Sequence, residues 1–154
     1  MSNTISLKSV ITAGIIATAA MTAFTFMAPI MGFEMDIPGM LAGTMGTPKI
    51  IGWAAHFMIG IILAFNFAAL FLPNIKQSNK IISGALFGVI PWLLAQIMVM
   101  PLMTLMNGGT FTSGLFSGSL LISAASFMGH ILYGIVLGAF YKPETTTAFN
   151  TAKV

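Results

Sequence analysis

The chain divides into four long apolar runs separated by short polar breaks. The runs cover residues 9–32, 50–72, 81–106 and 115–140. The breaks carry charged residues, prolines or glycines, among them Glu34, Asp36, Pro73 and Gly108. Each run exceeds the roughly 20 residues that a helix needs to cross a bilayer. The pattern therefore predicts an all-α fold in which four membrane-spanning helices form a four-helix bundle.

Composition supports this prediction. Apolar residues make up 57% of the 154 positions and charged residues 6%, whereas a soluble domain carries about 25% charged residues. No lysine, aspartate or glutamate occurs between 81 and 141. We expect a single transmembrane domain over 1–154, ending in a polar tail at 142–154. The absence of cysteine excludes disulfides and thiolate sites.

The lysines predict the orientation. The net charge of +3 comes from six lysines and no arginine, and in so apolar a chain it indicates lysines at the membrane surface rather than nucleic-acid binding. If the four runs cross the membrane, five lysines fall on one side and Lys49 alone on the other. The positive-inside rule then places both termini in the cytoplasm. Glu34 and Asp36 would lie outside.

The two halves of the chain repeat one another. The segment 56–64, HFMIGIILA, is echoed by 130–138, HILYGIVLG, and shorter echoes lie upstream in the same order. We therefore expect a duplicated helical hairpin, with halves at about 8–72 and 80–141. Because each half holds two spans, the halves are parallel and related by a pseudo-two-fold axis along the membrane normal. This places His56 and His130 at similar depth on facing walls.

The repeat carries a histidine and two small residues at four-residue spacing, which shares one helix face. The stripes are His56, Gly60 and Ala64, and His130, Gly134 and Gly138. One interpretation is a packing seam, because small residues let membrane helices approach closely. The other is a ligand site, because ionisable groups inside a membrane are costly. Facing imidazoles could bind haem b, and the adjacent glycines would leave room for the porphyrin.

Methionine suggests a different metal. Among the 13 methionines, several gather toward the predicted outer side, and their thioethers together with imidazole suit Cu(I). The candidate ligands are Met27, Met31, Met100 and Met103. The alternative is that methionine fills irregular gaps in an apolar core. Glu34 and Asp36 could attract a cation to an outer mouth, or could be a solvated loop and the cap of a short helix at 36–41.

The sequence offers little for catalysis. It holds no nucleophile elbow, zinc-protease motif or phosphate loop, and a histidine pair without an acidic partner is a poor acid–base device. We therefore predict no enzyme. Kinks at Pro29 and Pro101 could open a cavity with Gln96 and Asn66 as polar lining, so transport of a small solute or ion is a third alternative.

Three segments carry a resemblance to a known family. With MDIPGML at 35–41, GWAAHFMIG at 52–60 and GHILYG at 129–134, the chain resembles a family of small bacterial four-span membrane proteins with no established activity. The resemblance implies a bacterial inner-membrane location and assigns no functional residue. The leading prediction is a non-enzymatic accessory or binding component with a histidine pair between its hairpins. Its expected partners are the lipid bilayer and a membrane protein or a second copy, and no nucleic acid.

Overall fold

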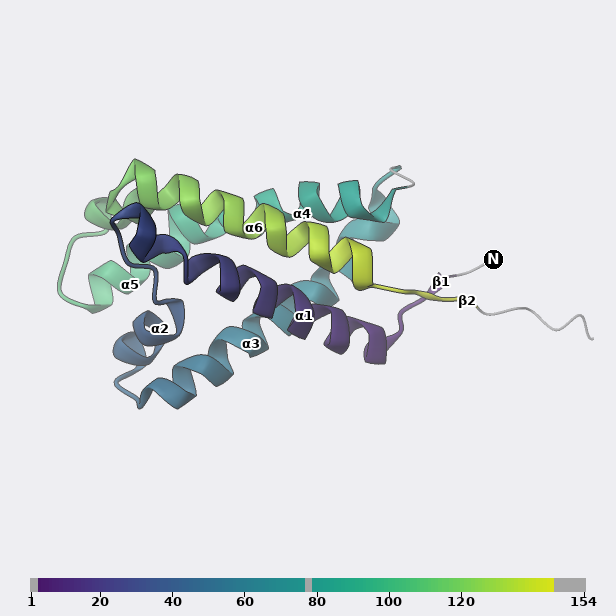
Figure 1. Cartoon of the computed structure of the whole chain (residues 1–154), viewed down its shortest axis with the longest axis horizontal. Coiled ribbons are helices and arrows are strands. Elements are labelled where there is room, and N and C mark those ends of the chain that lie inside the picture. Colours follow the sequence, from purple (N-terminus) through teal and green to yellow (C-terminus); the bar gives the residue numbers. More distant parts are fainter. Residues whose placement is uncertain (1–2, 77–78, 146–154) are drawn as a thin grey trace, which may run out of the picture.

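The computed structural model describes residues 3–76 and 79–145, and this part of the chain is almost entirely helical (Figure 1). Its α-helices are α1 Leu7–Thr25, α2 Ile37–Met45, α3 Lys49–Asn66, α4 Lys80–Leu94, α5 Met100–Met106 and α6 Leu120–Phe140. Shorter 3-10 and π-helical segments join them: η1 Ala28–Met31, η2 Phe67–Phe71, η3 Leu72–Asn74, η4 Ala95–Val99 and η5 Thr112–Gly118. Two residues at each end pair as β1 Asn3–Thr4 and β2 Glu144–Thr145.

Four helical stretches are long and apolar enough to cross a membrane. They run over Leu7–Ile30, Lys49–Asn74, Lys80–Met106 and Leu120–Phe140. The second and third agree with the predicted runs within two residues at each end, and π-helical segments interrupt both. In the first, α1 ends at Thr25 and a 3-10 turn that includes Pro29 follows. Proline lacks the backbone N–H that a continuing helix would use.

The fourth helix begins later than the sequence predicts. The predicted start at residue 115 is wrong, because Phe116 and Ser117 have φ values of 51° and 57°, which no right-handed helix accommodates. The helix begins at Leu120, and the side chain of Ser119 caps it by accepting from the Ile122 amide.

Helix α1 lies centrally and packs against both α3 and α6, while α4 packs against α6 (Figure 1). Glycines permit two of these contacts. A methyl group on Gly60 of α3 would lie 1.8 Å from the Thr18 hydroxyl of α1, and one on Gly134 of α6 would lie 2.0 Å from the Gly84 carbonyl of α4. The backbones therefore approach as closely as small residues allow in membrane helix pairs.

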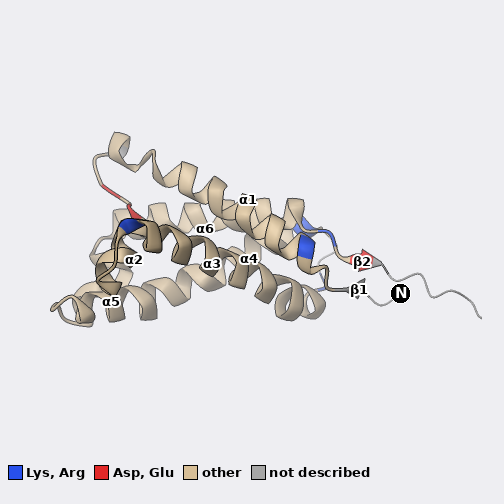
Figure 2. Ribbon diagram, turned by 90° about the horizontal axis from the view of Figure 1, so that it is seen from below, with Lys and Arg blue, Asp and Glu red and all other residues tan. Residues whose placement is uncertain are grey.

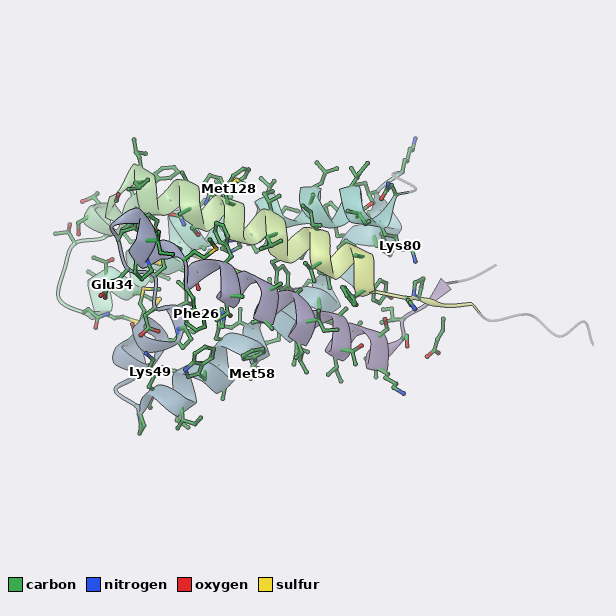
Figure 3. All side chains as sticks on the ribbon, in the orientation of Figure 1. Phe26, Glu34, Lys49, Met58, Lys80 and Met128 are labelled. Atoms are coloured by element: carbon green, nitrogen blue, oxygen red, sulfur yellow. The ribbon has the colours of Figure 1, made fainter. Side chains whose placement is uncertain are left out.

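Among the described residues, the charged positions lie at the two ends of the ribbon (Figure 2). Glu34 and Lys49, with Asp36 paired to Lys49, lie at the end that holds α2 (Figure 3), and the other described lysines, among them Lys80, lie at the opposite end with β1 and β2. At the terminal end, the Ser6 hydroxyl donates to Glu144 across 2.8 Å beside the β1–β2 ladder. The first residues of the predicted tail are thus paired, while 146–154, including Lys153, lie outside the described residues.

Candidate functional site

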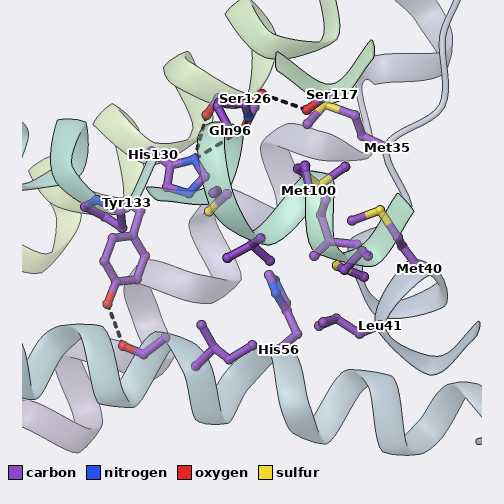
Figure 4. Close-up of a pocket in the computed structure, with 18 of the residues that line it drawn as sticks. Met35, Met40, Leu41, His56, Gln96, Met100, Ser117, Ser126, His130 and Tyr133 are labelled. Atoms are coloured by element: carbon purple, nitrogen blue, oxygen red, sulfur yellow. Dashed lines mark hydrogen bonds between the residues drawn. The ribbon is translucent and has the colours of Figure 1, made fainter. Parts of the chain in front are cut away.

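A cavity of about 570 Å³ opens between α3 on one side and α4, η4 and α5 on the other. Helices α1 and α6 contribute the remaining walls, and residues 34–41 line the end near α2. The lining is mostly aliphatic and thioether, but both histidines of the chain belong to it (Figure 4). His56 and His130 stand on different walls of this cavity, on α3 and α6. Helix α1 contacts α6, and the cavity lies beside this contact, between α3 and α4.

His56 is buried on α3, with 8% of its surface exposed. Its Nε2 lies 3.0 Å from the hydroxyl oxygen of Thr22 on α1. That hydroxyl has a single proton, which it donates to the Thr18 carbonyl at 2.8 Å. The threonine oxygen therefore accepts from the imidazole, and Nε2 carries the proton. Trp53 and Phe57 meet the ring at steep angles and hold it in place.

His130 is held by a chain of hydrogen bonds that begins in η5 (Figure 4). The Ser117 hydroxyl donates to Gln96 Oε1 at 2.8 Å, and Gln96 Nε2 donates to the Ser126 hydroxyl at 3.3 Å. Nδ1 of His130 lies 2.8 Å from the Ser126 carbonyl, one helical turn away. A carbonyl only accepts, so Nδ1 carries the proton on this ring.

Local backbone geometry brings Gln96 into the cavity wall. Pro91 lies inside α4 and removes one helical hydrogen bond, and the π-helical η4 follows it. Such π segments shift the register of a helix face and often occur at functional sites. Gln96 is 1% exposed, and its hydrogen-bonded amide satisfies the rule that buried polar groups need partners.

Tyr133 forms the end of the cavity that faces the protein core. Its hydroxyl donates to the Gly60 carbonyl at 2.6 Å, so it joins α6 of the second hairpin to α3 of the first. Tyr133 is 2% exposed. It belongs to the core cluster that also includes Phe67 and Leu137. The floor is therefore closed, and the cavity extends toward the end of the molecule that holds α2.

The candidate copper ligands separate into two groups. Met100 and Met103 line the cavity, but Met27 does not, and it is 55% exposed. The side chain of Met31 lies outside the described residues. Other methionines line the same space: Met21, Met35 and Met40. Among the described residues, no group of three histidine, aspartate or glutamate side chains could hold a metal ion.

Glu34 and Asp36, the candidates for an outer mouth, both line the cavity at the end near α2. Asp36 is already engaged: it caps α2 by accepting from the Gly39 amide at 2.9 Å, and it pairs with Lys49. The hydrogen bond from Lys49, supported by that amide, lowers the pKa of Asp36. The capped short helix predicted at this point is confirmed as α2.

The small residues of the two stripes pack against neighbouring helices. The space beside Gly60 is filled by Thr18, that beside Gly134 by the Gly84 backbone, and that beside Gly138 by the Lys80 backbone. Ala64 is fully buried in the core cluster. The expectation that these glycines leave room for a porphyrin is therefore wrong, because helix backbones and side chains occupy those positions.

Sequence reasoning did not assign Ser126, Ser117, Thr22 or Tyr133 to the site. Ser126 had a detectable signal, because it precedes His130 by four residues and shares its helix face. The sequence predicts Gln96 as polar lining of a cavity that helix kinks could open, and the structure places Gln96 in the cavity wall. Ser117 and Tyr133 reach the cavity, and Thr22 reaches His56, through the tertiary arrangement, which no spacing in the sequence encodes.

No curated protein and no solved structure matches the chain significantly. A family model does match, over residues 6–150, which include all four long apolar helices and the whole cavity wall. That family is described as a family of unknown function. The chain belongs to this family, DUF6789.

Proposed function

We propose that this chain is a multi-pass protein of a bacterial inner membrane that binds a small lipid-soluble molecule between its two hairpins. It acts by binding rather than by catalysis. One observation carries the proposal: a single, mostly apolar cavity contains both intramembrane histidines. Its volume of about 570 Å³ falls in the range of about 300–1,000 Å³ that is usual for small-molecule sites.

The membrane assignment is supported by the distribution of charge. Four stretches are long and apolar enough to span a bilayer, and the charged residues gather at or beyond their ends (Figure 2). The end with the termini holds most of the lysines, so the positive-inside rule places it in the cytoplasm. The cavity then lies toward the outer half of the membrane, where residues 34–41 form its rim.

The duplication of the hairpin is supported by equivalent packing contacts. Gly14 of α1 meets the backbone of α3 near Gly60, and Gly84 of α4 meets the backbone of α6 at Gly134. These glycines occupy matching places in the two halves. A duplicated, parallel hairpin explains why each half supplies one histidine to the same interior space.

The binding proposal is tested by native mass spectrometry of the protein extracted in mild detergent and freed of any histidine tag. We expect a bound small molecule on the wild type and its loss from Leu63→Trp, because Leu63 lines the cavity and the indole would occupy it. Ile62→Trp is the matched control, because Ile62 lies on the same helix but does not line the cavity, and it is 51% exposed. A wild type without bound molecules, or equal retention by both variants, would refute binding in this cavity.

A second candidate, Cu(I) binding, is supported by the thioethers in the same space. Five methionines line it together with two imidazoles, and both ligand types suit Cu(I). Elemental analysis of the purified protein for copper tests this candidate. An absorption spectrum tests haem b in the same sample, because bis-histidine haem has an intense Soret band.

A further inference from the structure

The two imidazoles are in opposite tautomers, yet each offers the cavity one nitrogen that accepts a hydrogen bond. In His130 the proton lies on Nδ1, which donates to the Ser126 carbonyl, so Nε2 keeps an unshared electron pair. In His56 the proton lies on Nε2, which donates to Thr22, so Nδ1 keeps the electron pair. Each neutral ring therefore offers one hydrogen-bond acceptor that is free of any partner among the described residues.

Most hydroxyl groups of the wall already donate their proton within the protein. Thr18 donates to the Gly14 carbonyl at 2.7 Å, Ser117 to Gln96 at 2.8 Å and Tyr133 to the Gly60 carbonyl at 2.6 Å. Gln96 uses its carbonyl for Ser117 and one N–H for Ser126, so its second N–H and the Ser126 hydroxyl are the donors that remain. The thioether sulfurs are acceptors as well. A ligand in this cavity consequently meets mainly acceptors, and it gains hydrogen bonds by donating them.

The size and lining of the cavity indicate that the ligand is organic and has an apolar body. A water molecule takes a share of about 30 Å³ in the liquid, so a metal ion alone would fill a small part of the 570 Å³. The remaining wall is aliphatic and thioether, which favours an apolar molecular body. An organic ligand fills this space, whereas an isolated ion leaves most of it empty.

Resting on the proposed function, we infer that the ligand is a lipid-soluble molecule with hydroxyl groups on opposite edges, which donate to His56 and His130. The two rings stand on different walls, on α3 and α6 (Figure 4), so a ligand that meets both needs a hydroxyl on each of two edges. An alkyl hydroquinone has this chemistry: two O–H donors across a flat apolar ring. Its oxidised quinone has only acceptors and would face acceptors on both walls.

Three probes with one carbon skeleton test the inference: an alkyl-1,4-hydroquinone, its dimethyl ether and its quinone. Binding to the detergent-solubilised wild type is measured by isothermal titration under reducing conditions for the hydroquinone. We expect the hydroquinone to bind at least tenfold more tightly than either relative. His130→Phe should reduce this preference several-fold, and His130→Gln should restore part of it through its amide oxygen. Met128→Phe, on the exposed face of α6, is the control and should preserve it.

The outcomes separate this inference from the proposed function. Equal binding of hydroquinone and ether, or tighter binding of the quinone, would overturn the donor requirement while binding in the cavity stands. Stoichiometric Cu(I) on a protein that takes none of the probes would also overturn it. If Leu63→Trp abolishes hydroquinone binding and Ile62→Trp does not, the inference is supported at the cavity itself.

Discussion

Replacing Gly134 with alanine should separate α4 from α6. The added methyl carbon would lie 2.0 Å from the Gly84 carbonyl oxygen and 2.7 Å from its carbon, whereas an ordinary contact begins at 3.4 Å. Because both groups belong to helix backbones, no side chain can rotate away, and the helices must move apart by about 1 Å or more. Overpacking of this kind costs about 1–3 kcal/mol, which exceeds the gain of about 0.5–1 kcal/mol from removing a glycine inside a helix.

Gly129 provides the matched control on the same helix. A methyl group there would meet its nearest atom, in Met21, at 3.6 Å, an ordinary contact. Unfolding in mixed micelles with increasing SDS fraction, followed by tryptophan fluorescence, measures both variants against the wild type. We expect Gly134→Ala to lose about 1–3 kcal/mol of unfolding free energy and Gly129→Ala to lose none. Equal stability of the two variants would refute the close approach of α4 and α6.

Three further predictions concern the floor, the rim and the orientation. Tyr133→Phe should lower the unfolding free energy by about 0.5–1.5 kcal/mol, the usual value of one hydrogen bond, in the same micelle assay; an unchanged value would remove the link between α3 and α6. Asp36→Ala should cost about 1 kcal/mol through loss of the cap of α2, and Asp36→Asn less, because asparagine also caps; equal losses would contradict the capping role. Lys49 lowers the pKa of Asp36 below its usual 3.8. The ion pair should therefore contribute to the unfolding free energy at neutral pH and lose that contribution only as the pH falls through the lowered pKa. A loss of the stability difference between wild type and Asp36→Asn already at pH 6 would contradict this. In a chain without cysteine, an impermeant maleimide should label Thr110→Cys in intact cells and Pro73→Cys only after permeabilisation; the reverse pattern would invert the topology.

The sequence predicted the helices well where hydrophobicity alone determines them. The second and third apolar runs correspond to helical stretches within two residues, because a continuous apolar segment has few alternatives to a helix in a membrane. It failed at the start of α6, because the positive φ values fall on Phe116 and Ser117 rather than on a glycine. The π-helical segments likewise had no sequence signal.

The candidate site was predicted in part. The spacing of the repeat pointed to both histidines, and the structure places both on the wall of one cavity. The methionines were less informative, because α1 ends at Thr25 and leaves Met27 exposed rather than in the cavity wall. The direct partner of His130, Ser126, lies one turn away on the same helix, whereas Gln96 and Ser117 join it through the packing of η4 and η5, which is a property of the folded chain.

The tautomers of the two histidines test the central claim most directly. Because the chain has only two histidines, uniform ¹⁵N-histidine labelling in a tag-free protein gives signals from two rings alone, and His130→Gln assigns them. We predict a proton on Nδ1 of His130 and on Nε2 of His56, with the unprotonated nitrogens of both rings shifting when the hydroquinone binds. Identical tautomers in the two rings, or no response of either ring to saturating hydroquinone, would contradict the account.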